Sequence, residues 1–193
     1  MLKVAWRFDC NPPEYKVRDG RPIAYGAADG PSEVNATPVF YQGRVYVATG
    51  QDPEQGEGVG HLVCVDAATG SLVWDTKAIH RSLSTVAIDP GTGLLFTADF
   101  SGFVYGLDAR TGQVAWTHDM KAHVWGSALV AGGRVYVGDE DGDLCVLAAS
   151  RDKKVLGEVN LGGPIYSTPV AANATLYVLT QSALHAFGGP KQP

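Results

Sequence analysis

A nine-residue stretch occurs twice in this chain, and the distance between its copies constrains the fold more than any other feature. Residues 66–74 read DAATGSLVW and residues 108–116 read DARTGQVAW, so the second copy begins 42 positions after the first. A period of about forty residues, with four short strands per unit, is typical of the blades of a β-propeller. The repeat therefore predicts an all-β fold built from similar four-stranded sheets.

Each residue type in the repeat has a physical task in docking one blade on the next. The aspartate ends a strand, and its side chain accepts hydrogen bonds from the backbone of the turn that follows. The threonine supports that turn, and the glycine supplies a left-handed conformation that other residues adopt only with strain. The next strand delivers a tryptophan, which buries roughly 150–250 Å² of surface. The predicted docking residues are Asp66, Thr69, Gly70, Trp74, Asp108, Thr111, Gly112 and Trp116.

Short apolar strands and turn residues extend the pattern over most of the chain. They predict a single domain over residues 1–193, with an isolated strand at residues 2–8, an irregular segment at 9–35, and blades at 37–77, 84–118, 127–159 and 168–187. The last blade offers only three strands, so the isolated strand either completes it in a ring of about four blades or belongs to a larger propeller of about seven or eight. No DxxTG turn precedes residue 2, which favours the larger propeller.

Composition excludes several classes of function. The formal net charge is −5 and no basic run is present, which argues against a nucleic-acid partner. No apolar stretch approaches the ~18 residues of a membrane-spanning helix, and the first ten residues do not resemble a signal peptide. The three cysteines form no CxxC motif, so neither a disulfide framework nor a zinc site is indicated. Cys64 and Cys145 lie in apolar strands and are expected to be buried.

The two copies of the repeat resemble the tryptophan-docking motif of the pyrroloquinoline quinone (PQQ)-like β-propellers. The resemblance covers nearly the whole chain apart from residues 9–35. It implies a bacterial protein of the periplasm or the secreted fraction, because the family includes both quinoprotein alcohol dehydrogenases and the non-enzymatic propeller of the outer-membrane assembly machinery. The dehydrogenases bind PQQ and calcium beneath a pair of adjacent cysteines. This chain has neither adjacent cysteines nor a CxxCH haem motif, so the resemblance implies a shape rather than a chemistry.

Candidate binding residues follow from the alternating direction of antiparallel strands. Links from the second to the third strand of a blade, and from its fourth strand to the next blade, share one side of the propeller, which we call the long-loop face. The two longest connections, residues 9–35 and 50–60, both belong to that face. Long loops on a rigid scaffold commonly bind partners. The candidates are Tyr15, Arg18, Arg21, Tyr25, His80, His118, His123 and Trp125, with the three histidines expected in links near the central axis.

Metal binding is considered at two acidic places and favoured at neither. Asp52, Glu54, Glu57 and His61 offer oxygen and nitrogen ligands, but without the spacing of an EF-hand, so a solvated acidic loop is the preferred interpretation. The acidic residues around Gly142 are better explained as a hairpin turn. No P-loop, HExxH or GxSxG motif is present.

The sequence thus predicts a non-catalytic β-propeller scaffold without a cofactor, which binds a protein or an extended ligand through the long-loop face. Two alternatives stay open. One is a fragment of a PQQ-dependent alcohol dehydrogenase, which would need PQQ and calcium. The other is a purely structural segment that packs against another domain.

Overall fold

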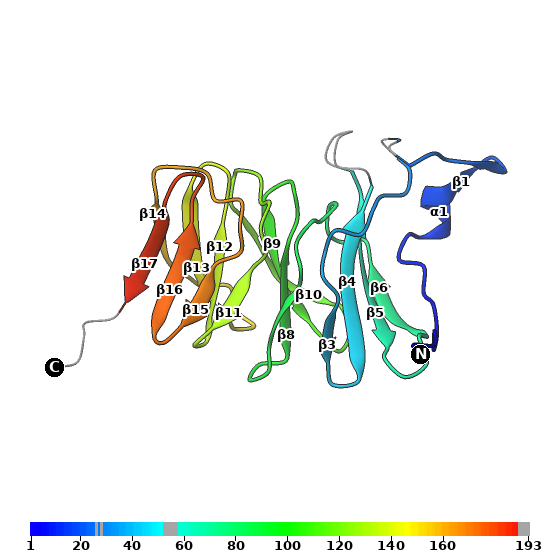
Figure 1. Cartoon of the computed structure of the whole chain (residues 1–193), viewed down its shortest axis with the longest axis horizontal. Helices are drawn as coiled ribbons and strands as arrows, with labels where there is room; N and C mark the ends of the chain where they lie inside the picture. The colour runs from blue at the N-terminus through cyan, green and yellow to red at the C-terminus, as the bar shows by residue number, and fades with distance from the viewer. Residues whose placement is uncertain (26, 28, 52–57, 189–193) are drawn as a thin grey trace.

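The computed structural model describes residues 1–25, 27, 29–51 and 58–188 of the chain. Four antiparallel sheets stand side by side along the longest axis of the molecule (Figure 1). Each sheet is a meander whose strands pair in sequence order. The predicted all-β, propeller-type fold is confirmed.

The strands of the four sheets agree closely with the predicted blades. The first sheet contains β3 (Val39–Tyr41), β4 (Arg44–Gly50), β5 (Gly60–Asp66) and β6 (Leu72–Thr76). The second contains β7 (Ala87–Asp89), β8 (Leu94–Ala98), β9 (Phe103–Asp108) and β10 (Val114–Asp119). The third contains β11 (Leu129–Ala131), β12 (Arg134–Gly138), β13 (Asp143–Ala148) and β14 (Val155–Asn160). The fourth contains β15 (Val170–Ala172), β16 (Thr175–Leu179) and β17 (Leu184–Gly188).

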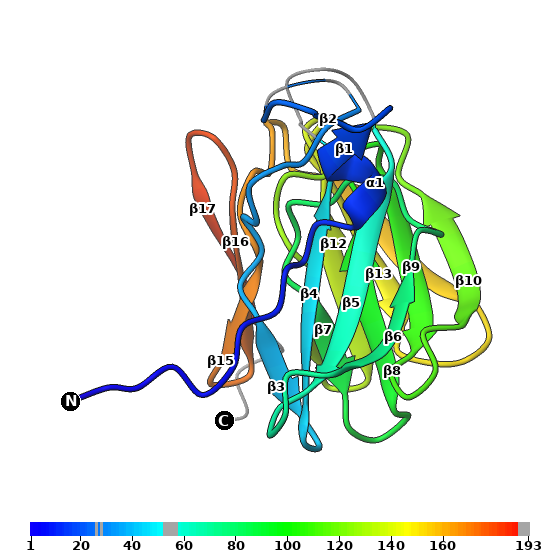
Figure 2. The ribbon, with the colours of Figure 1, turned by 90° about the vertical axis from the view of Figure 1, so that its right-hand side faces the viewer.

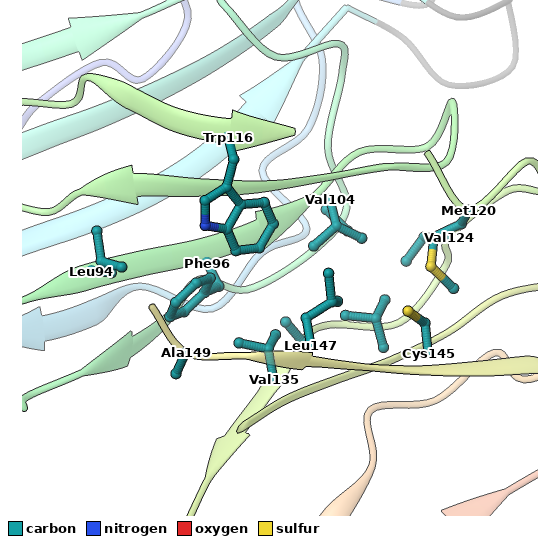
Figure 3. Packing of buried hydrophobic residues seen from close by; sticks show 13 residues of the cluster. Leu94, Phe96, Val104, Trp116, Met120, Val124, Val135, Cys145, Leu147 and Ala149 are labelled. Carbon is teal, nitrogen blue, oxygen red and sulfur yellow. The ribbon is translucent and has the colours of Figure 1, made fainter. Parts of the chain in front are cut away.

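The hydrophobic core lies between neighbouring sheets. Every residue of β8 is buried, which requires a neighbour on each face of the second sheet. Between the second and third sheets, Phe96 and Trp116 pack with their ring centroids 5.7 Å apart, next to Val135 and Leu147 (Figure 3). The short first strands β7 and β11 contact each other, so the sheets converge at their first strands and diverge at their fourth.

Each complete sheet has a register shift at the same place, between its third and fourth strands. In the first sheet Trp74 pairs with Cys64 while Leu72 pairs with Val65, so one residue of β6 is left over. The second and third sheets repeat this shift beside Trp116 and Gly157. A β-bulge bends its strand and re-aims the side chains that follow. The repeated bulge therefore belongs to the docking geometry, and a pattern of residue types does not reveal it.

The predicted N-terminal strand is wrong. Residues 2–8, all of them described, form no strand. The N-terminus lies at the end of the molecule formed by β5 and β6, far from β17 (Figure 1). These residues therefore do not complete the fourth sheet. A strand requires a partner for its backbone, and none of the described strands pairs with this segment.

The segment at residues 9–35 contains more regular structure than the irregular connection predicted. It holds a one-turn helix α1 (Pro13–Lys16) and a hairpin of β1 (Val17–Arg18) and β2 (Arg21–Pro22). Its two ends are tied together, because the Asn11 side chain donates to the Ser32 carbonyl at 2.9 Å and accepts from the Ser32 amide at 3.2 Å. Helix α1 and the hairpin lie over the first sheet near the long-loop face (Figure 2).

Candidate functional site

The tryptophans of the repeat join neighbouring sheets at the short-turn face, opposite the long-loop face. Trp74 Nε1 donates to the Ala109 carbonyl of the second sheet at 3.1 Å. Trp116 Nε1 donates to the Ser150 carbonyl, next to the third sheet, at 2.8 Å. The N-terminal segment copies the arrangement without a strand, since Trp6 Nε1 donates to the Ala67 carbonyl at 3.0 Å. Trp6 thus occupies the place that the fourth strand of a preceding blade would fill.

The turns that receive the tryptophans are organised by their aspartates. Asp66 accepts hydrogen bonds from the backbone amides of Ala68 and Thr69 and from the Thr69 hydroxyl, all through Oδ1. The bonds from Thr69 hold the pKa of the Asp66 carboxyl below its usual range. Asp108 accepts from the Thr111 amide in the same way. Asp108 also accepts from the guanidinium of Arg151 at 2.7 Å, and this bond is the main cause that lowers its pKa.

Two independent features of these turns, the backbone conformation and the close approach of a tryptophan ring, each require glycine. Gly112 has φ +74°, and a Cβ there would lie 2.5 Å from Cε3 of Trp74. Gly70 has φ +71°, and a Cβ there would lie 2.6 Å from Cδ2 of Trp6. The indole therefore lies flat on the glycine, so that the turn conformation and the close approach require the same residue.

A second series of contacts links the sheets just before their first strands, and sequence reasoning missed it. The Thr37 amide donates to the Thr85 hydroxyl at 2.9 Å, the Thr85 amide to the Ser127 hydroxyl at 2.8 Å, and the Ser127 amide to the Thr168 hydroxyl at 3.0 Å. We call this series the hydroxyl chain. The signal was present in the sequence, since serine or threonine recurs at the same place in each unit.

The long-loop face carries a continuous row of aromatic side chains from successive blades. The rings of Phe100 and His123 are stacked with centroids 4.3 Å apart. Trp125 makes T-shaped contacts with Phe100 and Tyr166, with ring centroids 4.7 Å and 5.9 Å apart. Trp125 is 42% exposed and Tyr166 49% exposed. We call Phe100, His123, Trp125 and Tyr166 the aromatic row.

Three members of the aromatic row, Phe100, His123 and Trp125, are held by polar contacts. The buried Arg81 places its guanidinium carbon 4.3 Å from the Phe100 ring centre, a cation–π contact. His123 Nδ1 donates to the Phe100 carbonyl at 2.6 Å, and Trp125 Nε1 donates to the Glu140 carboxylate at 2.9 Å. An exposed aromatic surface with fixed side-chain conformations loses little entropy when a partner binds.

Two buried carboxylates stabilise the turns beneath the aromatic row. Asp99 accepts from the Tyr105 hydroxyl at 2.6 Å and from the Phe103 amide at 3.0 Å. Asp139 accepts from the amides of Asp141 and Asp143, which supports the hairpin-turn interpretation of that acidic stretch. Burial raises the pKa of the Asp139 carboxyl.

The histidines predicted to gather near the axis lie in different environments. His80 Nδ1 is 3.1 Å from Asp99 Oδ2, and His123 belongs to the aromatic row. The predicted placement of His118 is wrong. It lies within β10, where its Nε2 is 3.5 Å from the Cys145 sulfur of β13, between two sheets. Burial accordingly lowers the pKa of the His118 imidazole.

The candidate binding residues in the segment at residues 9–35 also differ in their exposure to solvent. Tyr15 is buried, and burial raises the pKa of its hydroxyl to about 12. Its hydroxyl lies 3.4 Å from the Val59 carbonyl, so Tyr15 attaches the segment to the first sheet and is not free to meet a partner. Arg18 and Arg21 are on the exposed hairpin, where Arg18 pairs with Asp29, and Tyr25 is 63% exposed.

Of the weak metal candidates, only His61 can be placed. Asp52, Glu54 and Glu57 lie outside the described residues. His61 is buried in β5, and its ring nitrogens are 2.8 Å from the Cys10 carbonyl and 2.8 Å from Asp75 Oδ2. Both nitrogens thus already have protein partners, which anchor residue 10 to the first sheet. Across the described part of the chain, no three His, Cys, Asp or Glu side chains are grouped so that they could hold a metal ion.

The sheets, their tryptophan contacts and their period define the class: a β-propeller of the PQQ-like repeat type. The chain belongs to the family described as outer membrane protein assembly factor BamB, whose model matches residues 3–101 and again residues 100–187. The resemblance that the repeat suggested is confirmed.

One relative by sequence and two solved structures with a similar fold illustrate the similarity. BamB of Legionella pneumophila (strain Paris) is 27% identical over 170 residues, which cover 85% of this chain and 41% of the relative. The crystal structure of BamB from Moraxella catarrhalis superimposes with a TM-score of 0.61 at 20% identity, covering 81% of this chain and 58% of the other. The structure of quinohemoprotein alcohol dehydrogenase ADHIIG from Pseudomonas putida HK5 superimposes with a TM-score of 0.60 at 18% identity. The match covers 74% of this chain and 28% of the other. This chain therefore spans less than half the length of its Legionella relative.

Proposed function

We propose that this chain is a non-catalytic β-propeller scaffold that binds a protein or another extended ligand through its long-loop face. The observation that carries the proposal is the aromatic row, in which Trp125 and Tyr166 are large and about half exposed, and the Trp125 indole is held by the Glu140 carboxylate. Tryptophan and tyrosine are enriched among the residues that dominate protein–protein binding energies. A relative named as an outer membrane protein assembly factor agrees with such a role.

The proposed location is the periplasm or the secreted fraction. Support comes from the name of the family, which refers to assembly of the outer membrane. No helix in the described ranges has both the length and the apolar character needed to cross a membrane.

The proposal is tested by capture of partners on the full chain. Wild type and the double variant Trp125→Ala/Tyr166→Ala would be immobilised and exposed to a bacterial envelope extract, and the retained proteins identified by mass spectrometry. We expect the double variant to lose the proteins retained by wild type, because each anchor side chain contributes about 2 kcal/mol or more at an interface centre. A matched control, Arg110→Ala, changes an exposed side chain on the short-turn face and should leave capture intact. Equal capture by all three proteins would contradict the proposal.

The alternative function is a fragment of a quinoprotein alcohol dehydrogenase. The ADHIIG structure supports it only at the level of the fold. Titration of the chain with PQQ and calcium, together with an assay of alcohol oxidation, tests this alternative.

A further inference from the structure

A small pocket opens beside the aromatic row, between the second and third sheets. Its volume is about 270 Å³. Three connections of the long-loop face contribute to it: the β8–β9 turn, the β10–β11 link and the β12–β13 turn. The residues that line it are Ser101, Lys121, Ala122, His123, Glu140 and Asp141. Two of them, His123 and Glu140, also position the aromatic row.

The lining of the pocket is rich in hydrogen-bond acceptors for which the described part of the chain supplies no partner. Glu140 uses Oε2 to accept from Trp125, which leaves its other oxygen available. Because His123 Nδ1 donates to a carbonyl, the neutral ring keeps the lone pair of Nε2. Ser101 Oγ is buried, and no hydrogen-bond partner for it occurs among the described residues. A buried hydroxyl without a partner costs free energy until a ligand or water supplies one.

The charges around the pocket select a cation as the complementary group. Glu140 and Asp141 both line it, and neither carboxylate is in an ion pair within the described part of the chain. The single basic residue of the lining, Lys121, is exposed and has room to turn towards solvent. A pocket slightly smaller than the roughly 300–1,000 Å³ of small-molecule sites suits one side chain rather than a whole metabolite.

We propose that this pocket receives an arginine side chain of the bound protein, while the flanking residues of that segment lie on the aromatic row. The inference rests on the proposed function and names the chemistry of its partner. A guanidinium carries five N–H donors, pairs with carboxylates and stacks on aromatic rings, so it matches all the groups present. Lysine matches the carboxylates but not the flat aromatic surface beside them.

The probe is the tripeptide acetyl-Tyr-Arg-Tyr-amide, compared with the same peptide carrying citrulline, which has the shape of arginine without its charge. The ¹⁵N-labelled full chain would be titrated with each peptide, and the indole N–H signal of Trp125 followed by NMR. A Trp125→Phe spectrum assigns that signal among the four tryptophans. We expect the arginine peptide to bind at least about tenfold more tightly, because hydrogen bonds to charged groups are stronger than neutral ones.

Variants test whether the selectivity comes from the pocket. Glu140→Gln/Asp141→Asn keeps side-chain oxygens, including an acceptor for Trp125, and should reduce the affinity for the arginine peptide to that for the citrulline peptide. The control Asp152→Asn removes an exposed negative charge on the opposite face and should leave the tenfold preference unchanged. Equal binding of the two peptides by wild type, or a preference that survives in the double variant, would overturn the inference. So would the absence of a Trp125 shift with about 10 mM arginine peptide.

The same variants separate this inference from the proposed function. If Trp125→Ala/Tyr166→Ala abolishes partner capture while Glu140→Gln/Asp141→Asn retains it, the long-loop face binds a protein but the arginine pocket is refuted. If neither variant affects capture, the proposed function fails as well.

Discussion

At the scale of single residues, the three docked tryptophans make the same hydrogen bond with different degrees of burial. Trp116 is 7% exposed and packs on Phe96, whereas Trp74 and Trp6 are half-buried. Trp74 also lies between two four-stranded sheets, the first and the second, but it is less enclosed there than Trp116 is between the second and the third. We therefore expect the energy of docking to follow the burial of the indole rather than the motif alone.

We predict that Trp116→Ala lowers the free energy of unfolding by about 3–5 kcal/mol, as for other large aromatic residues in packed cores. Trp74→Ala should cost less, and Trp6→Ala should cost about 1 kcal/mol, close to one hydrogen bond. Urea denaturation followed by circular dichroism measures all three values. Equal losses for Trp116→Ala and Trp6→Ala would contradict the link between docking energy and burial.

At the scale of elements, the turn after the third strand combines a backbone requirement with a packing requirement. Gly112 has φ +74° and supports the Trp74 ring. Gly133, in the β11–β12 turn, has φ +71°, but a Cβ added there would meet no atom within 4 Å. The two glycines therefore have similar φ angles, but only Gly112 is in contact with a neighbouring side chain.

We predict that Gly133→Ala costs about 1–2 kcal/mol, the strain of a left-handed non-glycine residue. Gly112→Ala should cost an additional amount of about 1–3 kcal/mol, because the methyl group displaces Trp74. The difference between the two denaturation midpoints isolates the docking contact. If Gly112→Ala proves no worse than Gly133→Ala, the indole does not depend on the glycine surface.

The sequence predicted these elements well because turns and strands are local. The repeat identified Trp74 and Trp116 and the glycines of the docking turns, Gly70 and Gly112. The predicted blade boundaries agree with the observed sheets within a few residues. The aligned β-bulges were missed because they depend on pairing between strands, which residue types do not reveal. Residues 2–8 have a strand-like pattern, but a strand requires a partner, and this information is not local. His118 was misplaced because its position was inferred from a link, whereas the strand continues to Asp119.

At the scale of the whole molecule, the sheets extend in a row, and the N-terminus and β17 lie at its opposite ends (Figure 1). The described sheets therefore form an open row in which β17 does not pair with the first sheet. Within those residues no group of metal-binding side chains is assembled. Trp125 and Tyr166, on the long-loop face, are exposed to solvent.

We predict that the chain does not bind PQQ saturably at micromolar concentration, with or without calcium. Tight small-molecule sites typically bury about 70–90% of the surface of the ligand. A ligand that is contacted from one side only would have much less of its surface buried. Titration followed by tryptophan fluorescence measures this, with Trp125→Phe as the control for surface stacking. Saturable micromolar binding together with dye-linked alcohol oxidation would favour the dehydrogenase alternative instead.

The hydroxyl chain and the tryptophans have a joint consequence for how such a protein changes over evolutionary time. Every junction between complete sheets is fastened twice, by an indole at the short-turn face and by a hydroxyl near the first strands. Each of these hydrogen bonds joins a donor on one sheet to an acceptor on or beside the next sheet. Both donors recur in the two units that carry the DxxTG…W repeat. A duplicated unit of this kind therefore carries the donor for the junction on one side and the acceptor for the junction on the other side. Gene duplication can therefore lengthen the array, and deletion can shorten it, without the invention of a new joint.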